Sequence, residues 1–146
     1  GFASRLPMLE TIGRSSLEKD EHDACSVFGV EINPQARRQD VWIGSFDEMP
    51  ATWENRFAVI YSNSFDQSQD PYKSAGEWFR VLKPGGYLVF CYSEGIAPTL
   101  TDPVGGINLA NAATLFTDLS EGNEIIYYMK SGSRNHYSEL ILKKAG

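Results

Sequence analysis

Short apolar runs separated by polar or glycine- and proline-containing segments make up most of the chain. Runs of four to six residues rich in β-branched and aromatic side chains are typical of strands, whereas apolar residues at helical spacing indicate helices. The pattern predicts strands at 26–30, 40–43, 57–61, 87–91, 124–129 and 138–142, and helices at 3–12, 71–82 and 109–119.

The stretch EWFRVLKPGGYLVF, residues 77–90, predicts a helix that runs directly into a strand. Its apolar residues keep helical spacing up to Leu82. Pro84 cannot continue a helix, because it has no N–H and clashes with the preceding turn. Gly85 and Gly86 can adopt positive φ at little steric cost. The apolar run that follows is typical of a strand buried on both faces, so the prediction is a helix, a tight turn and an interior strand.

The order of these elements predicts an α/β fold. Strands alternate with helices and then end in two strands joined by KSGSRNH, a polar connection of hairpin length. We therefore expect a mostly parallel sheet with a C-terminal antiparallel hairpin. The sequence has no repeat and no linker, which predicts one domain over residues 1–146.

Composition and charge narrow the function classes. Hydrophobic residues make up 42% and charged residues 22%, as in ordinary globular proteins. A net charge of -6 disfavours non-specific binding to nucleic acid. No apolar run approaches the roughly 18 residues that span a bilayer, so a cytoplasmic location without membrane contact is expected. Cys25 and Cys91 lie in no metal-ligand spacing, and no metal site is expected.

Polar residues follow three successive predicted strands. In open parallel sheets, ligands bind beyond the carboxyl ends of the strands. An acidic residue there can accept hydrogen bonds from the two hydroxyls of a ribose, and an aromatic with a carboxylate can hold an adenine. Each position alone is a weak signal, because polar residues often end strands. The residues are Glu31, then Ser45, Phe46 and Asp47, then Ser62 and Asn63.

Three segments together resemble the class I S-adenosylmethionine-dependent methyltransferases that act on small molecules: VFGVEIN, GSFDEMP and FAVIYSNSFDQSQDPYKSAGEWFRVLKPGGYLVF. The resemblance runs from about Val27 to Cys91, and the closing hairpin resembles the family's reversed last strand. It implies a Rossmann-like methyltransferase fold, S-adenosylmethionine as cofactor with S-adenosylhomocysteine as product, and methyl transfer to an unidentified small-molecule acceptor.

The resemblance also implies roles for individual residues. Glu31 would bind the cofactor ribose, and Ile32 would pack on the adenine. The methionine part and the substrate mouth would lie near the end of the third strand. Gly1 would be the tail of the family's glycine-rich loop. The full set of expected cofactor-binding residues is Gly1, Glu31, Ile32, Ser45, Phe46, Asp47, Ser62 and Asn63.

The chain departs from the family pattern in three places. The first strand, which forms the middle of the family's sheet, and most of the glycine-rich loop do not precede Gly1, so the expected fold is truncated. The segment between Asn33 and Asp40 is too short for the usual helix. Asp66-Gln67 stands where this branch often has Glu-His, so no histidine role is supported, and we assign no catalytic residue.

Two other functions remain open. A catalytically silent methyltransferase-like interaction module is favoured by the absent glycine loop, and a nicotinamide enzyme could use Glu31 on the same ribose. The expected partner is a small-molecule substrate, with homo-oligomerisation left open. Asp66 and Asp70 could form a paired carboxylate site, although Asp70 as a helix cap and Asp66 in solvent is the favoured interpretation.

Overall fold

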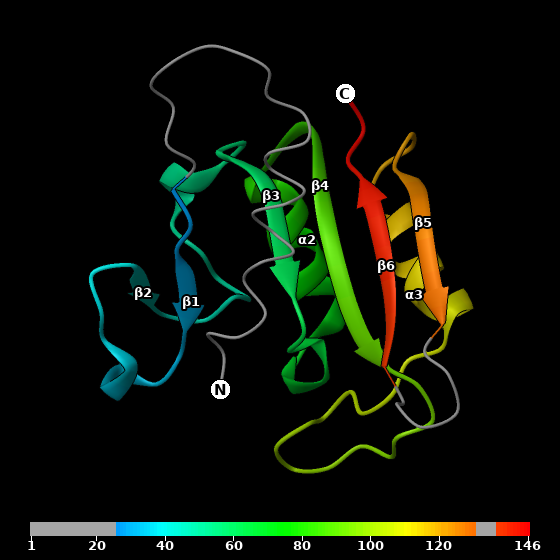
Figure 1. Ribbon diagram of the computed structural model, residues 1–146, viewed down its shortest axis with the longest axis horizontal. Helices are drawn as coiled ribbons and strands as arrows, with labels where there is room; N and C mark the ends of the chain where they lie inside the picture. Colours follow the sequence, from blue (N-terminus) through cyan, green and yellow to red (C-terminus); the bar gives the residue numbers. More distant parts are fainter. Residues whose placement is uncertain (1–25, 131–136) are drawn as a thin grey trace.

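Two sheets form the frame of the protein, as the computed structural model in Figure 1 shows. The structure describes residues 26–130 and 137–146. The smaller sheet pairs β1 (Gly29–Glu31) in parallel with β2 (Val41–Ile43). The larger sheet has the order β3-β4-β6-β5, with bounds Phe57–Ser62, Leu82–Ser93, Tyr137–Lys143 and Glu124–Lys130.

The larger sheet is parallel at one side and antiparallel at the other. β3 pairs in parallel with β4, β4 pairs antiparallel with β6, and β6 pairs antiparallel with β5. The α/β prediction with a C-terminal antiparallel hairpin is therefore confirmed. β1 and β3 are not hydrogen-bonded to each other, so the two described sheets are separate.

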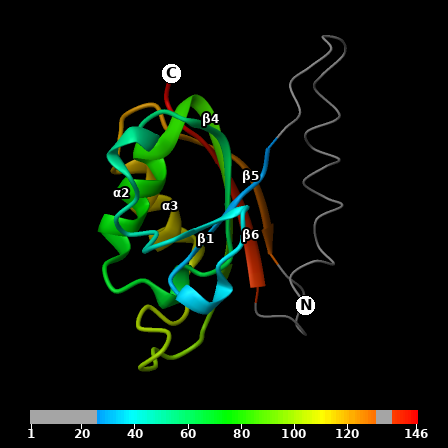
Figure 2. The ribbon, with the colours of Figure 1, turned by 90° about the vertical axis from the view of Figure 1, so that its left-hand side faces the viewer.

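Two helices pack against one face of the larger sheet, α2 (Pro71–Val81) and α3 (Leu109–Thr117) (Figure 2). Alternate β4 residues point toward them, and Leu88 and Phe90 are fully buried. The centroid of the Phe90 ring lies 5.0 Å from the ring centroid of Phe65 and 5.1 Å from that of Phe116. The predicted apolar face of the first of these helices is confirmed, because Trp78, Phe79 and Val81 are all buried. Leu82, which is predicted in the same helix, is also buried but begins β4.

Side-chain caps fix where the two helices begin. Asp70 Oδ1 accepts hydrogen bonds from the Tyr72 and Lys73 N–H groups, both at 3.1 Å, and Pro71 occupies the first turn. Proline is tolerated there because its missing N–H would have no partner in the helix. The predicted cap at Asp70 is confirmed. Asn108 caps α3 in the same way through the Asn111 N–H at 2.8 Å.

The Lys-Pro-Gly-Gly segment, where a tight turn is predicted, lies within the bounds of β4 and interrupts its pairing with β3. β4 starts at Leu82, directly after α2, and the register shifts between the Phe57↔Leu82 and Val59↔Tyr87 pairs. The two glycines therefore lie in an irregular start of the strand. Gly85 does adopt the expected positive φ, 72°. Gly86 lets β4 lie close to β3, because a Cβ there would lie 3.0 Å from the Ala58 carbonyl oxygen and 2.9 Å from that of Lys83.

Short 3-10 turns connect the remaining strands. Asn33 caps the turn Pro34–Ala36, in the segment that is predicted to be too short for a helix of usual length. Similar turns at Ala51–Trp53 and Phe65–Gln67 precede and follow β3. Among the helices of the described residues, none is long and apolar enough to cross a membrane.

Candidate cofactor site

The site is built from the carboxyl ends of parallel strands. Glu31 is the last residue of β1 and pairs with Ile43, the last residue of β2. Ser62 ends β3 in the same way. The arrowheads of β1, β3 and β4 point in one direction in Figure 1, so these strand ends lie toward the same edge of the molecule. The predicted polar residues after the strands therefore lie at that edge.

Glu31 has an oriented carboxylate at this edge. Its Oε1 accepts a hydrogen bond from the Asn33 N–H at 2.8 Å, and its backbone carbonyl accepts one from the Gly44 N–H at 2.9 Å. The side chain is half-buried, whereas that of Ile32 is 74% exposed. Thus β1 ends in a fixed acidic group followed by an accessible apolar side chain, directly beside the loop that follows β2.

The loop that follows β2 carries the three residues predicted to surround an adenine. Ser45, Phe46 and Asp47 are all half-buried. The Ser45 hydroxyl accepts a hydrogen bond from the Asp47 N–H at 3.1 Å, which turns the chain locally. The Phe46 ring meets that of Trp78 on α2 edge to face, with 5.6 Å between centroids. Phe46 is thus held between the loop and the helix.

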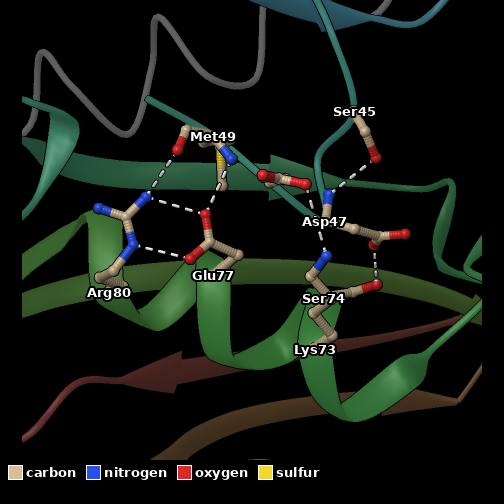
Figure 3. Close-up of polar contacts among 8 residues, drawn as sticks. Ser45, Asp47, Met49, Lys73, Ser74, Glu77 and Arg80 are labelled. Atoms are coloured by element: carbon tan, nitrogen blue, oxygen red, sulfur yellow. Dashed lines mark hydrogen bonds and ion pairs between the residues drawn. The ribbon is translucent and has the colours of Figure 1, made fainter. Parts of the chain in front are cut away.

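Asp47 is bound to the helix through its side chain. Its carboxylate accepts a hydrogen bond from the hydroxyl of Ser74 on α2 (Figure 3). The Ser74 hydroxyl also lies 2.5 Å from that of Ser68, and both serines are fully buried. This carboxylate therefore fixes the loop to α2, and its expected contact with an adenine amino group stays a prediction.

A second anchor holds the same loop, and sequence reasoning missed it. Glu77 Oε2 accepts the Met49 N–H at 2.8 Å, while Arg80 donates to Glu77 Oε1 at 2.7 Å and to the Met49 carbonyl at 3.0 Å (Figure 3). The hydrogen bonds from Arg80 lower the pKa of Glu77 and raise that of Arg80. The signal in the sequence was a pair of opposite charges three residues apart on the predicted helix.

The end of β3 carries a small polar turn. The Ser62 hydroxyl accepts the Ser64 N–H at 3.4 Å, and the Asn63 side-chain oxygen accepts the Ser64 hydroxyl at 3.2 Å. Ser62 is half-buried and Asn63 is exposed. Both lie at the predicted place, and their contact with a methionine group stays a prediction. Gly1 lies outside the described residues.

Acidic groups lie next to this turn, on the expected substrate side. One carboxyl oxygen of Asp66 is buried without a hydrogen-bond partner among the described residues, and burial and the charge of Asp102 raise the Asp66 pKa. The favoured interpretation of Asp66 as solvated is therefore wrong. Its backbone carbonyl accepts the Val104 N–H at 3.1 Å, and the Ser93 carbonyl accepts the Ile107 N–H at 2.9 Å. The loop after β4 thus folds back beside it.

The set of residues fits the nucleoside half of the expected cofactor. An oriented carboxylate suits the ribose hydroxyls, and the neighbouring Ile32 and Phe46 supply apolar and aromatic surface for a base. No group of three or more His, Cys, Asp or Glu side chains in the described ranges could hold a metal ion. The fold and this edge together define a Rossmann-like nucleotide-binding protein.

Comparison with known proteins identifies the family. Residues 12–90, more than half of the chain, match the model of the methyltransferase domain family. The chain therefore belongs to this family of class I, S-adenosylmethionine-dependent proteins, and its cofactor is S-adenosylmethionine. A search of curated proteins found no match.

Several solved structures share the fold at low sequence identity. An S-adenosylmethionine-dependent methyltransferase from Methanosarcina mazei has a TM-score of 0.61 and 18% identity, with 82% of each chain covered. A Burkholderia thailandensis 1,6-didemethyltoxoflavin-N1-methyltransferase, with 1,6-didemethyltoxoflavin and S-adenosylhomocysteine bound, has a TM-score of 0.64 and 15% identity, covering 83% of this chain and 62% of that one. The cyclase SpnF has a TM-score of 0.60 and 16% identity, covering 73% and 56%.

Proposed function

We propose that this chain binds S-adenosylmethionine through Glu31 and transfers its methyl group to a small-molecule acceptor. The observation that carries the proposal is the Glu31 carboxylate, which ends β1 and is oriented by the Asn33 N–H. Family membership gives the cofactor. In the Burkholderia structure the bound molecules are a small acceptor and S-adenosylhomocysteine, which supports the same class of acceptor for this chain.

The remaining residues would position the cofactor. Ile32 and Phe46 would pack against the adenine, and Asp47 would keep the loop of Phe46 against α2 through its bond to Ser74. Ser62 and Asn63 would line the methionine side. The bound cofactor supplies a methyl group on an already activated sulfonium. The protein must then mainly hold the acceptor in line with it.

The acceptor would lie on the side of Asp66 and the loop after β4. Burial favours the protonated form of Asp66, so this carboxyl can donate a hydrogen bond at a pH where exposed carboxyls cannot. Such a donor would orient an acceptor that carries a carbonyl or a ring nitrogen.

Calorimetry with S-adenosylmethionine and S-adenosylhomocysteine tests the cofactor site. Glu31→Ala should weaken binding about ten- to a hundredfold, because a charge-assisted hydrogen bond contributes roughly 1.5–3 kcal/mol. Asp40→Ala is the matched control, since Asp40 lies just before the opposite end of the same small sheet and is mainly exposed. Equal affinity of the parent chain and Glu31→Ala would refute the assigned ribose contact.

A second candidate function is a methyltransferase-like domain without methyl transfer. The name of the cyclase neighbour shows that this fold serves other reactions. Failure of the parent chain to bind either cofactor form would support this candidate over the enzyme.

A further inference from the structure

The loop after β4, residues 94–108, lies beyond the carboxyl ends of β3 and β4 (Figure 1). Its outgoing limb, residues 95–101, is exposed, whereas its returning limb, residues 102–107, is half-buried or buried. Val104 and Ile107 of the returning limb pack against the core. Burial of side chains therefore fixes the returning limb but cannot fix the outgoing limb.

Glu94, the first residue of this loop, is bound to the C-terminal hairpin. Its Oε1 accepts a hydrogen bond from the Ser138 hydroxyl on β6 at 3.1 Å, and its Oε2 lies 3.5 Å from the Lys130 ammonium on β5. Ser138 is 4% exposed, whereas 69% of the Lys130 side chain is exposed. Because exposed ion pairs contribute little, the buried Ser138 hydroxyl is the contact that holds Glu94.

The two limbs of the loop are joined at their base. The Gly106 N–H donates to the Ile96 carbonyl at 2.7 Å, and the Ile107 N–H donates to the Ser93 carbonyl at 2.9 Å. A Cβ on Gly106 would lie 2.6 Å from the Ile96 nitrogen, so the limbs come this close because glycine has none. The position of the outgoing limb therefore determines that of the returning limb.

The returning limb in turn contacts Asp66. The Val104 N–H donates to the Asp66 backbone carbonyl at 3.1 Å. One carboxyl oxygen of Asp66 is buried, and burial together with the charge of Asp102, a residue of the returning limb, raises the Asp66 pKa. The surroundings of the Asp66 carboxyl thus depend on where this loop lies.

We propose that Glu94 is a positioning residue whose bond to Ser138 holds the loop after β4 against Asp66. The C-terminal hairpin thereby determines the surroundings of the carboxyl on the acceptor side. Its consequence for methyl transfer rests on the proposed function, whereas the position of the loop does not. The experiments use neither cofactor nor acceptor, so a failure of the proposed function and a failure of this inference give different results.

Amide hydrogen exchange measured by NMR tests the proposal at the Val104 and Ile107 N–H groups. Glu94→Ala removes the acceptor of the Ser138 hydroxyl. Both exchange rates should rise about ten- to a hundredfold, because a hydrogen bond to a charged group shifts an equilibrium by about that factor. Amides in the middle of α2 should keep their rates, since the opening is local. Glu124→Ala, which removes an exposed glutamate at the other end of β5, should change none of these rates.

Two further variants separate the hydrogen bond from the charge. Glu94→Gln loses the same charge as Glu94→Ala but keeps an acceptor for the Ser138 hydroxyl, so it should restore the exchange rates of the parent. Ser138→Ala removes the donor and should raise the rates as Glu94→Ala does. Equal rates in the parent and Glu94→Ala would overturn the proposal. An equal rise in α2, or a Glu94→Gln variant that exchanges as fast as Glu94→Ala, would also overturn it.

The pKa of Asp66 gives a readout on the acceptor side, and the chemical shift of its carboxyl carbon follows it in an NMR titration. This pKa should move toward its ordinary value of 3.8 in Glu94→Ala and stay at the parent value in Glu94→Gln. The direction follows because an open loop takes both the burial and the Asp102 charge away from Asp66. The same Asp66 pKa in the parent and in Glu94→Ala would contradict the proposed positioning.

Discussion

The Glu77 carboxylate links the loop after β2 to α2, and its removal should destabilise the protein measurably. Glu77→Ala leaves the Met49 N–H without its acceptor and removes the carboxylate from Arg80. The pair is shielded from water, with 19% of the Glu77 side chain and 28% of the Arg80 side chain exposed. Loss of hydrogen bonds to a charged group in such a place costs about 2–3 kcal/mol.

This loss can be measured as a change in thermal stability. For a chain of this size, about 2–3 kcal/mol corresponds to a fall of about 6–9 °C in Tm. Arg38→Ala is the matched control. It breaks an ion pair at 3.0 Å whose side chains are 71% and 52% exposed, and exposed pairs contribute less than about 1 kcal/mol. If Glu77→Ala lowers the Tm no more than Arg38→Ala, the anchor does not hold the loop.

The pH dependence gives a second check on the same pair. Arg80 lowers the pKa of Glu77 in the folded state from its ordinary 4.5. The stabilisation is therefore complete above pH 4.5 and is lost as the pH falls through the lowered folded pKa. Glu77→Gln keeps an acceptor for the Met49 N–H but has no charge, so its stability gap from the parent should close in acid. A gap that stays constant would show that the charge contributes nothing.

Four further substitutions test other parts of the structure. Burial raises the pKa of Tyr92 from 10.0 to about 12. The stability that the protonated Tyr92 side chain gives the folded state is therefore lost as the pH rises above 10. Tyr92→Phe, which has no group to titrate, should resist urea better than the parent at about pH 11. Gly105→Ala should cost roughly 1–3 kcal/mol in urea unfolding, because φ is +61° and a Cβ would lie 2.7 Å from backbone atoms, whereas Gly76→Ala has open space and should stabilise by about 0.5–1 kcal/mol. Ser74→Ala leaves the Asp47 carboxylate without this donor and should weaken S-adenosylmethionine binding in calorimetry; unchanged affinity would show that this bond does not position the loop.

The fold followed from the sequence where local rules and burial agree. The cap at Asp70, the proline after it and the apolar face around Trp78 all indicate one helix, and the structure has it. The start of β4 could not be predicted from the sequence, because the first residue of a strand that directly follows a helix is set by pairing with the neighbouring strand. Leu82 pairs with Phe57, a contact that no local pattern specifies.

Only part of the candidate site could be predicted from the sequence, because the rest depends on contacts between residues distant in the chain. The position of Glu31 comes from strand order and could be predicted, since any residue after a parallel strand lies at that edge. The two anchors of the loop join Asp47 to Ser74 and Met49 to Glu77, residues far apart in the sequence. The burial of Asp66 depends in the same way on the loop after β4, which returns to contact it.

The position of β6 has a consequence for synthesis of the chain. This strand follows β5 along the chain, yet it pairs with both β4 and β5. Until it is made, β4 and β5 cannot be joined, and each presents an unpaired apolar edge of the kind that promotes aggregation. Joining of β4 to β5 must therefore wait for residues 137–143, and contacts of this sequence separation favour slow folding. A C-terminal truncation before Tyr137 would split the sheet rather than shorten it.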